Sequence, residues 1–396
     1  MSKLHQIEGI KIGTSSSNQE YGNRLDTVLV EIKEESKLSG LFTTNNLKAA
    51  PVQICSKNIL SSNKNKKYLV INAGNANAAT GLKGLKDCEQ INSFLSKEFT
   101  SKKNNFLPFS TGVIGKRLNI PKYKKALIRA KNNLGKSNWK NFAESIMTTD
   151  SKIKLIKKTI KVKNKRVNIF AIAKGSAMIH PNMATLLSFV FTDLKINSKD
   201  LNKLHKLACN QSLNAISVDG DLSTNDSSLI VATGNSDLNF IESKEIIEKE
   251  IINTFKELSK KLMLDAEGSS KLITIKIKGL RSQKLCKKMA RHIANSLLLK
   301  TAFNGSDPNW GRIIMATCNL EDLPINPNNI TLKIGPHKVF SQGEISKNYS
   351  ESKGLKEFKK KTIVIELVLG KSDHSFEILT CDISPEYIRM NADYRS

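Results

Sequence analysis

The chain has 396 residues, 39% of them hydrophobic and 25% charged, and these proportions exclude an intrinsically disordered or fibrous protein. Its formal net charge is +27. No apolar run approaches the roughly 20 residues that span a bilayer, and the N-terminus lacks the apolar segment of a signal peptide. We therefore expect a soluble, cytoplasmic protein that has no membrane partner.

The first half of the chain mixes strands and helices. Runs rich in β-branched residues predict strands over residues 25–32 and 67–72. Residues 121–134 predict a lysine-coated helix with a proline in its first turn. Residues 159–173 alternate as a β-hairpin does, and the apolar run 186–191 predicts a buried strand.

The second half continues this mixture. Residues 198–213 predict a helix capped by Ser198, and an apolar stripe from Ile247 to Leu262 predicts a long helix. Residues 272–277 and 362–369 predict strands, and residues 283–300 have helical spacing. Strands and helices alternate too irregularly for a simple doubly wound sheet, so we expect a layered α/β architecture.

The positive charge is spread along the whole chain and comes mostly from lysine. Aromatic residues make up only 6% of the sequence, so few rings could stack on bases. We interpret the charge as a solvated basic surface and expect no nucleic-acid partner. A basic nucleic-acid-binding protein remains the alternative from a different functional class.

The six cysteines are scattered and form no CxxC pair. In a chain of this length such spacing predicts buried free thiols and no disulfide framework. No cysteine has metal-ligand spacing to a histidine or another cysteine, so we expect no bound metal. The cysteines are Cys55, Cys88, Cys209, Cys286, Cys318 and Cys381.

Common catalytic motifs are missing from the sequence. It contains no GxGxxG after a strand, no GxxxxGK[ST], no HExxH and no GxSxG. None of its six histidines stands beside a credible serine or cysteine nucleophile, which disfavours a Ser-His-Asp triad. The catalytic base must then come from elsewhere, and one known solution is a threonine activated by its own α-amine.

Several segments carry a family resemblance. They are LFTTN at 41–45, KAAPV at 48–52, KGSAMIHPNMATL at 174–186 and YIRMNADY at 387–394. Together they resemble the ArgJ family, the glutamate N-acetyltransferases of arginine biosynthesis, also called ornithine acetyltransferases. The resemblance runs over nearly the whole chain. It implies a layered αββα-type architecture of the DmpA/ArgJ-like fold, with two sheets between helices.

The resemblance also implies a self-cleaving enzyme with an N-terminal nucleophile. Cleavage between Ala184 and Thr185 would give an α chain of residues 1–184 and a β chain of residues 185–396. Thr185 would then be the nucleophile, and its new α-amine, with a reference pKa of about 7.7–8.0, could accept the proton of its hydroxyl. Two α and two β chains would form a heterotetramer.

The implied reaction is a ping-pong transfer of an acetyl group from N2-acetylornithine through Thr185 to glutamate. Thr111 and Gly112 match the oxyanion-hole pair of the family. No cofactor is implied, but the sequence leaves open whether acetyl-CoA serves as a second acetyl donor. The implied substrate contacts are Thr148, Lys174, Thr185, Glu267, Asn391 and Ser396.

Two departures from the family pattern concern residues in or near these segments. Ala177 stands where the family usually has glycine, and Ser396 stands where it usually ends in threonine, so the hydroxyl is retained. The second enzyme hypothesis is an N-terminal-nucleophile amidohydrolase or aminopeptidase, in which water would release the acyl group from Thr185.

Overall fold

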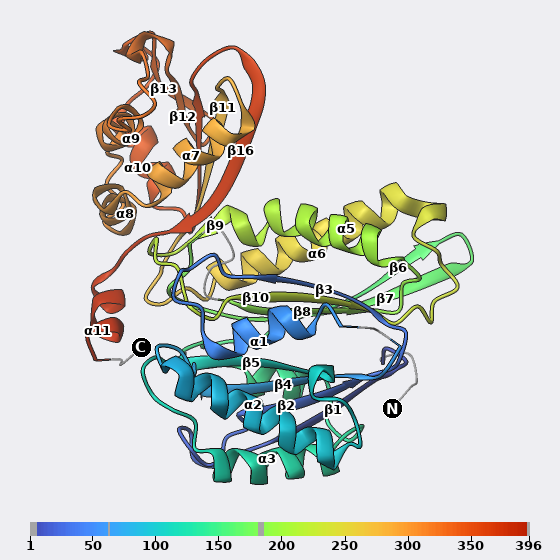
Figure 1. Ribbon diagram of the computed structural model, residues 1–396. Helices are drawn as coiled ribbons and strands as arrows, with labels where there is room; N and C mark the ends of the chain where they lie inside the picture. The colour runs from blue at the N-terminus through green and yellow to red at the C-terminus, as the bar shows by residue number, and fades with distance from the viewer. Residues whose placement is uncertain (1–5, 62–63, 181–185, 394–396) are drawn as a thin grey trace.

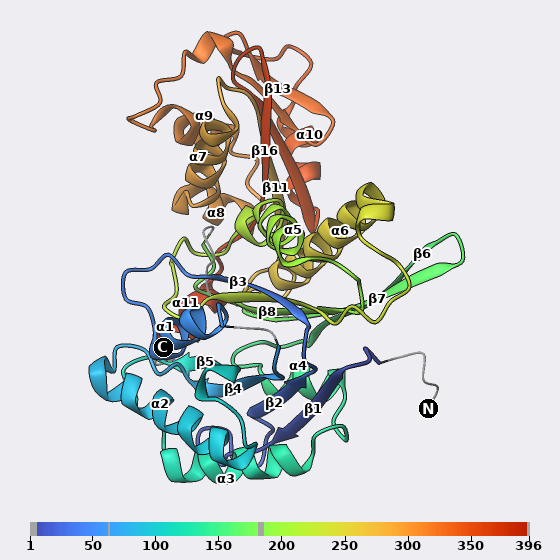
Figure 2. The same ribbon diagram turned by 45° about the vertical axis from the view of Figure 1, so that its right-hand side comes forward.

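The computed structural model describes residues 6–61, 64–180 and 186–393, and its strands form three sheets. A four-stranded and a five-stranded sheet lie face to face between helices, and a seven-stranded sheet forms an upper lobe (Figure 1). The turned view in Figure 2 shows the same stacking and the same separation of the lobe. Short 3-10 turns occupy Lys103–Asn105, Leu213–Ala215, Ile241–Ser243 and Pro327–Asn329.

The four-stranded sheet is built from the N-terminal part of the chain, in the order β1-β2-β4-β5. Its strands are β1 (Ile10–Ser15), β2 (Thr27–Ile32), β4 (Lys67–Asn75) and β5 (Phe106–Val113). Helices α2 (Gly81–Glu98) and α3 (Ile120–Asn132) cover its outer face, while α1 (Ala50–Asn58) packs against β5 and α2. Tyr68 and Val70 of β4 point toward α2 and α3 and join their apolar cluster.

The five-stranded sheet has the order β3-β10-β8-β7-β6. Its strands are β3 (Lys37–Phe42), β10 (Ser227–Ala232), β8 (Leu187–Thr192), β7 (Lys165–Lys174) and β6 (Lys154–Val162). Helices α5 (Ser198–Asn210) and α6 (Lys244–Met263) cover its outer face. The apolar stripe of α6 is buried against this sheet, because residues three and four apart share one face of a helix.

A layer of aromatic and branched side chains joins the two sheets. Leu69 and Ile71 of β4 alternate with the residues that face the helices, and they meet Phe189 of β8 across the interface. Phe142 of α4 (Trp139–Ser145) packs between the sheets, with its ring 5.3 Å from that of Phe189. The helix–sheet–sheet–helix layering expected from the sequence is therefore confirmed.

The seven-stranded sheet and its helices form the upper lobe, which the sequence did not lead us to expect as a separate unit. The strand order is β14-β13-β12-β15-β11-β16-β9. The strands are β9 (Ile216–Ser217), β11 (Leu272–Gly279), β12 (Thr331–Ile334), β13 (His337–Ser341), β14 (Glu344–Ile345), β15 (Thr362–Val368) and β16 (Ser372–Cys381). The helices are α7 (Gln283–Ala294), α8 (Leu297–Asn304), α9 (Trp310–Cys318) and α10 (Glu351–Phe358). After β16 the chain returns to the layered body as α11 (Pro385–Asp393).

Most elements predicted from the sequence are present, and two predictions are wrong in detail. Helix α5 is capped by Asn197 and not by Ser198, because the Asn197 side chain accepts a hydrogen bond of 2.9 Å from the backbone of Asp200. The segment 283–300 is two helices and not one. The break lies at Asn295, whose side-chain oxygen accepts a hydrogen bond of 2.6 Å from the Ser217 hydroxyl, and at the extended residue Ser296.

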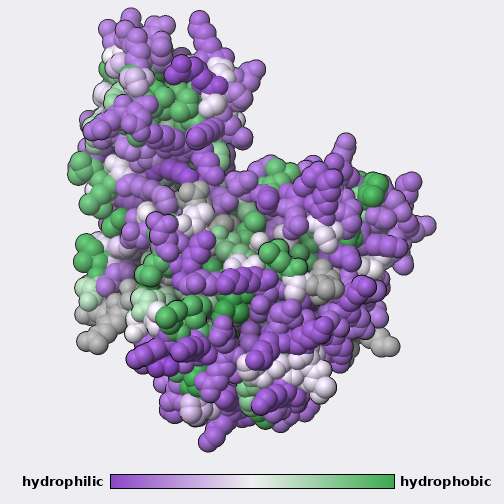
Figure 3. Space-filling model, viewed as in Figure 1, coloured by the Kyte–Doolittle hydropathy of each residue, from purple (hydrophilic) through white to green (hydrophobic). Residues whose placement is uncertain are grey.

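The surface in Figure 3 is mostly hydrophilic, as the lysine-rich sequence requires. Five of the six cysteines are buried free thiols as predicted, but Cys318 at the end of α9 is exposed, so the prediction is wrong for that residue. Within the three described stretches, no helix combines the length and the apolar character needed to cross a membrane.

Candidate active site

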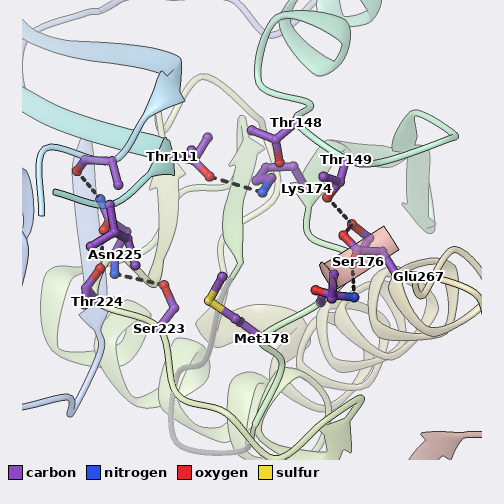
Figure 4. A pocket seen from close by; sticks show the side chains of 15 residues that line it. Thr111, Thr148, Thr149, Lys174, Ser176, Met178, Ser223, Thr224, Asn225 and Glu267 are labelled. Carbon is purple, nitrogen blue, oxygen red and sulfur yellow. Dashed lines mark hydrogen bonds between the residues drawn. The ribbon is translucent and has the colours of Figure 1, made fainter. Parts of the chain in front are cut away.

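A narrow pocket of about 50 Å³ lies where β5 and β7 end (Figure 4). Six residues implied by the family resemblance come together in its lining: Thr111, Gly112, Thr148, Lys174, Glu267 and Asn391. They come from segments up to 280 residues apart in the sequence (391 − 111). Ala184, Thr185 and Ser396 lie outside the described residues. The pocket is also lined by Ala76, Ile114, Thr149, Ser176, Ala177, Met178, Ser223, Thr224 and Asn225.

Gly112 occupies a position that only glycine fits. Its φ is +128°, and a Cβ atom there would lie 2.2 Å from the carbonyl carbon of Gly74. The close approach arises because β5 runs parallel to β4 and pairs Gly112 with Gly74 beside an irregularity in the strand register. The backbone beside Thr111 therefore reaches the pocket without a side chain in the way.

Lys174 is the buried cation of the pocket. It ends β7, and its Nζ donates a hydrogen bond of 3.1 Å to Oγ1 of Thr111 (Figure 4). Burial lowers the pKa of Lys174; Asp150 opposes this shift and Lys154 adds to it. The ammonium group is thus more acidic than that of an exposed lysine and is held next to the Thr111 hydroxyl.

A buried cluster of Lys154, Asp150 and Asp265 lies next to Lys174 and holds its chain segment in place. Lys154 Nζ lies 2.5 Å from a carboxylate oxygen of Asp150 and 2.6 Å from one of Asp265. Asp150 also accepts hydrogen bonds from the backbone of Gly175 at 2.7 Å and of Thr148 at 3.1 Å. The cluster therefore fixes the two chain segments that carry Thr148 and Lys174.

The lysines of the cluster keep the pKa of Asp150 below its usual value. Burial by itself would raise this pKa, but Lys174 and Lys154, together with the Gly175 backbone and the Lys154 hydrogen bond, hold it below its usual value. Asp150 and Lys154 were not among the site residues predicted from the sequence. Their spacing of four residues was a signal, but the segment between them is not helical, so only the fold shows that they meet.

Glu267 lies on the other side of the pocket from Thr111. Its carboxylate accepts hydrogen bonds from Ser176 Oγ at 3.2 Å and from Asn391 Nδ2 at 3.0 Å. The Ser176 hydroxyl is also 2.8 Å from that of Thr149. Asn391 belongs to α11, so the C-terminal helix closes this side of the pocket.

Asn225 and Asp226 connect the pocket to Leu186, the first described residue after the gap at 181–185. Asn225 donates to the backbone oxygens of Ala76 at 2.7 Å and Ser110 at 2.9 Å. Asp226 Oδ1 accepts a hydrogen bond of 2.8 Å from the backbone of Leu186. Neither residue was predicted to have a role, because an Asn-Asp pair is common in ordinary turns.

The second carboxylate oxygen of Asp226 is buried, and no hydrogen bond to it is formed within the described part of the chain. Burial raises the pKa of Asp226 well above its usual value, against smaller opposing effects of the Leu186 backbone, Lys174 and the Ser223 hydroxyl. A carboxyl group in this setting stays protonated more readily than an exposed one.

The histidines in the described part of the chain stand apart from the pocket lining. His205 is enclosed between the hydroxyls of Ser39 at 3.0 Å and Ser228 at 2.8 Å, and burial lowers its pKa to about 3. It is a neutral core residue. Within residues 6–61, 64–180 and 186–393, no group of three His, Cys, Asp or Glu side chains is placed to hold a metal ion.

The family model described as "ArgJ family" matches residues 7–396. This chain belongs to the ArgJ family. The resemblance seen in the sequence motifs is thereby confirmed over nearly the whole chain.

Named relatives support the same assignment. The arginine biosynthesis bifunctional protein ArgJ of Methylococcus capsulatus is 34% identical over 398 residues, covering 100% of this chain and 97% of the relative. The protein of the same name from Colwellia psychrerythraea is 37% identical over 415 residues, covering 99% of this chain and 97% of the relative. A crystal structure of ArgJ from Bacillus halodurans has 30% identity and a TM-score of 0.48, covering 52% of this chain and 99% of that chain. Because this TM-score is below 0.5, the assignment rests on the sequence matches.

Proposed function

We propose that the protein is a glutamate N-acetyltransferase that moves an acetyl group from N2-acetylornithine to glutamate through an acetyl ester on Thr185. The observation that carries this proposal is the contact between Lys174 and Thr111 beside Gly112, in a pocket closed on the other side by Glu267. Membership of the ArgJ family and the names of its relatives support the same activity.

The chemistry would proceed in two half-reactions. The Thr185 hydroxyl attacks the acetyl carbonyl, its proton passes to the Thr185 α-amine, and the amide nitrogen leaves as the amine of ornithine after protonation. The α-amine of glutamate then attacks the ester and regenerates Thr185. Donors from the Thr111 hydroxyl and the Gly112 backbone would stabilise the oxyanion in both halves.

The charged groups of the pocket suit the two amino acids. Lys174 provides a cation for an α-carboxylate, and Glu267 provides an anion for the side-chain ammonium of ornithine. Glu267 already accepts two hydrogen bonds, but two carboxylate oxygens offer about four acceptor positions. Thr148, Asn391 and Ser396 complete the proposed set of substrate contacts.

The nucleophile would arise by self-cleavage between Ala184 and Thr185, giving chains of residues 1–184 and 185–396. The fold is compatible with a cut at this place, because the five-stranded sheet takes β3, β6 and β7 from the first part and β8 and β10 from the second. Lys174 at the end of β7 pairs with Leu187 of β8, so hydrogen bonds would hold the two fragments together. We propose a heterotetramer of two such pairs.

Intact mass measurement and a two-step transfer assay test this function. The wild type should show a fragment that begins at Thr185, and Thr185→Ala should stay uncut and inactive. Acetylornithine alone should release about one ornithine per site, and added glutamate should then become acetylated. An active chain that remains uncut would contradict the mechanism. Continuous release of acetate in water would support an amidohydrolase.

The same assay, run with acetyl-CoA in place of acetylornithine, tests whether the protein is bifunctional. Formation of acetylglutamate from acetyl-CoA would add an amino-acid N-acetyltransferase activity. Its absence, with acetylornithine turnover intact, would restrict the enzyme to acetyl recycling.

A further inference from the structure

A second cavity, of about 1100 Å³, lies in the upper lobe beside α7 and the end of α9. Its lining is rich in cationic and imidazole side chains: Lys284, Lys287, Lys288, Arg291, His292 and His180. None of these residues takes part in the active-site contacts described above.

The sequence of α7 places its four cations along one face. Lys284, Lys287, Lys288 and Arg291 stand at positions i, i+3, i+4 and i+7, which lie together on a helix. Seven residues of helix rise about 10 Å, so the row is longer than one phosphate group. The opposite face, which includes Met289 and Ile293, is buried in the core of the lobe.

These cations repel one another. Burial first, and then the neighbouring Arg291, lower the pKa of Lys287 to about 8, and burial lowers the pKa of Arg291 to about 10. Lys288 has a partner in Asp322, at 2.6 Å on the open surface. Counting the described residues only, no carboxylate lies within 4.0 Å of Lys284 or Lys287. These two lysines therefore have no carboxylate in direct contact, and the nearby Glu377, which lines an adjoining cavity with them, is paired with Lys276 at 3.3 Å.

Four cations of α7 line this one cavity, whereas α2 contributes a single lysine, Lys86 or Lys97, to each of two other cavities. Lys122 and Lys125 of α3 line neither this cavity nor the active-site pocket. A solvated lysine face needs no concave wall around it. The α7 face has one, completed by Asn319 and Leu320 after α9.

The cavity is connected to the active-site pocket by a short piece of chain. His180 lines the cavity and Met178 lines the pocket. Two residues span at most about 7 Å of backbone. The segment is held in place because Asp219 accepts hydrogen bonds from the backbone of Met178 at 2.6 Å and of Ile179 at 3.0 Å. A ligand anchored on α7 could therefore extend toward the pocket.

We infer that this cavity binds a small-molecule anion that carries two or more phosphate groups. Lysines act as point charges for phosphate, and a row about 10 Å long fits several phosphates rather than a single carboxylate. Among the residues that the structure describes, no Phe, Tyr or Trp lines the cavity to stack a nucleic-acid base.

Two sources could supply this phosphate chemistry. One is a nucleotide thioester that donates an acyl group to the pocket, and this version rests on the proposed function. The other is a free nucleotide or pyrophosphate that binds without reacting. Binding itself can be measured whether or not the enzyme transfers acetyl groups.

Calorimetric titration of the full-length protein tests the site, with inorganic pyrophosphate, adenosine 3′,5′-bisphosphate and coenzyme A as separate probes. Lys284→Gln/Lys287→Gln should weaken binding of at least one probe tenfold or more. The matched control Lys122→Gln/Lys125→Gln removes the same charge from α3 and should leave binding unchanged. Equal weakening in both variants, or no binding of any probe at millimolar concentration, would overturn the inference.

Kinetics on the same variants distinguish the two sources. A rise in KM for acetyl-CoA of tenfold or more, with acetylornithine turnover unchanged, assigns the cavity to the acyl donor. Weaker probe binding without any change in acetyl-CoA kinetics assigns it to an unreactive phosphate ligand. Binding of a short DNA duplex that outcompetes all three probes, and is lost in the α7 variant, would overturn the small-molecule assignment. Failure of acetylornithine transfer in the wild type would count against the proposed function and leave the titration valid.

Discussion

Two groups of cations lie in this protein, one buried at the active-site pocket and one half-buried or exposed on α7, and their charges are balanced differently. Around the active-site pocket, Lys154 is in contact with the carboxylates of Asp150 and Asp265. On α7, neither Lys284 nor Lys287 has a carboxylate within 4.0 Å in the described part of the chain. The charges around the active-site pocket are paired without a ligand, so these contacts can hold the pocket rigid. The α7 group leaves positive charge available to an anion from solution.

The largest expected effect comes from breaking the balanced cluster. Lys154→Met leaves Asp150 and Asp265 buried without their shared cation, which should reduce the free energy of unfolding by about 3–5 kcal/mol. Urea denaturation in the uncleaved Thr185→Ala background measures it. Lys158→Met, in the same strand, removes only a partly exposed pair with Glu250 and should cost about 1 kcal/mol or less. Equal effects of the two substitutions would show that the buried cluster has no special importance.

The second-largest expected effect is on the rate of acetyl transfer and comes from changing Thr111 in the active-site pocket. Thr111→Val removes one proposed oxyanion donor and the acceptor of the Lys174 hydrogen bond. The barrier to transfer should rise by about 2.7–4 kcal/mol, which is roughly a 100- to 1000-fold loss in kcat. Steady-state transfer from acetylornithine to glutamate measures this loss. Thr159→Val, at the outer strand β6, is the matched control and should keep wild-type kcat.

A pH titration distinguishes carboxyl groups with and without a cation partner. The folded-state pKa of Asp226 is raised, so the folded protein binds this proton more tightly than the unfolded chain. Its contribution to stability is therefore greatest at low pH and is lost as pH rises above the unfolded value of about 4, by up to about 1.4 kcal/mol per pH unit.

Asp226→Asn should remove this dependence and keep an oxygen that can accept from Leu186. The difference in free energy of unfolding between variant and wild type should grow in favour of the variant as pH rises from 4 to 8. Asp150 has a lowered pKa, so its contribution to stability is lost as pH falls below the unfolded value of about 4, and Asp150→Asn should show the opposite pH dependence in that lower range. The same slope for both variants would contradict the contrast.

The smallest expected effect comes from the unbalanced group. Lys287→Gln removes a charge that is repelled by like charges at i−3, i+1 and i+4 of α7, so stability should rise by a few tenths of a kcal/mol, less at high salt. Denaturation at two salt concentrations measures this change. A loss of 2 kcal/mol or more would mean that Lys287 has a structural role like that of Lys154.

The fold could be predicted in part because its local signals agree with its packing. The strand at β2, the hairpin of β6 and β7, and the stripe of α6 follow from alternation and helical spacing alone. The break after Asn295 could not be found in this way, because it depends on a hydrogen bond from Ser217, 78 residues away. The upper lobe was missed because its strands look like any others until their pairing is known.

The sequence by itself determined the family, through the segment at 174–186 and its companions, and with it the residues expected in the site. It also determined that four cations share one face of α7, since helical spacing depends only on residue number. Tertiary structure decided that Asp150, Lys154 and Asp265 form one cluster, and that the α7 cations line a cavity. The physical reason is that burial and charge balance depend on neighbours brought together from distant segments, which no local pattern records.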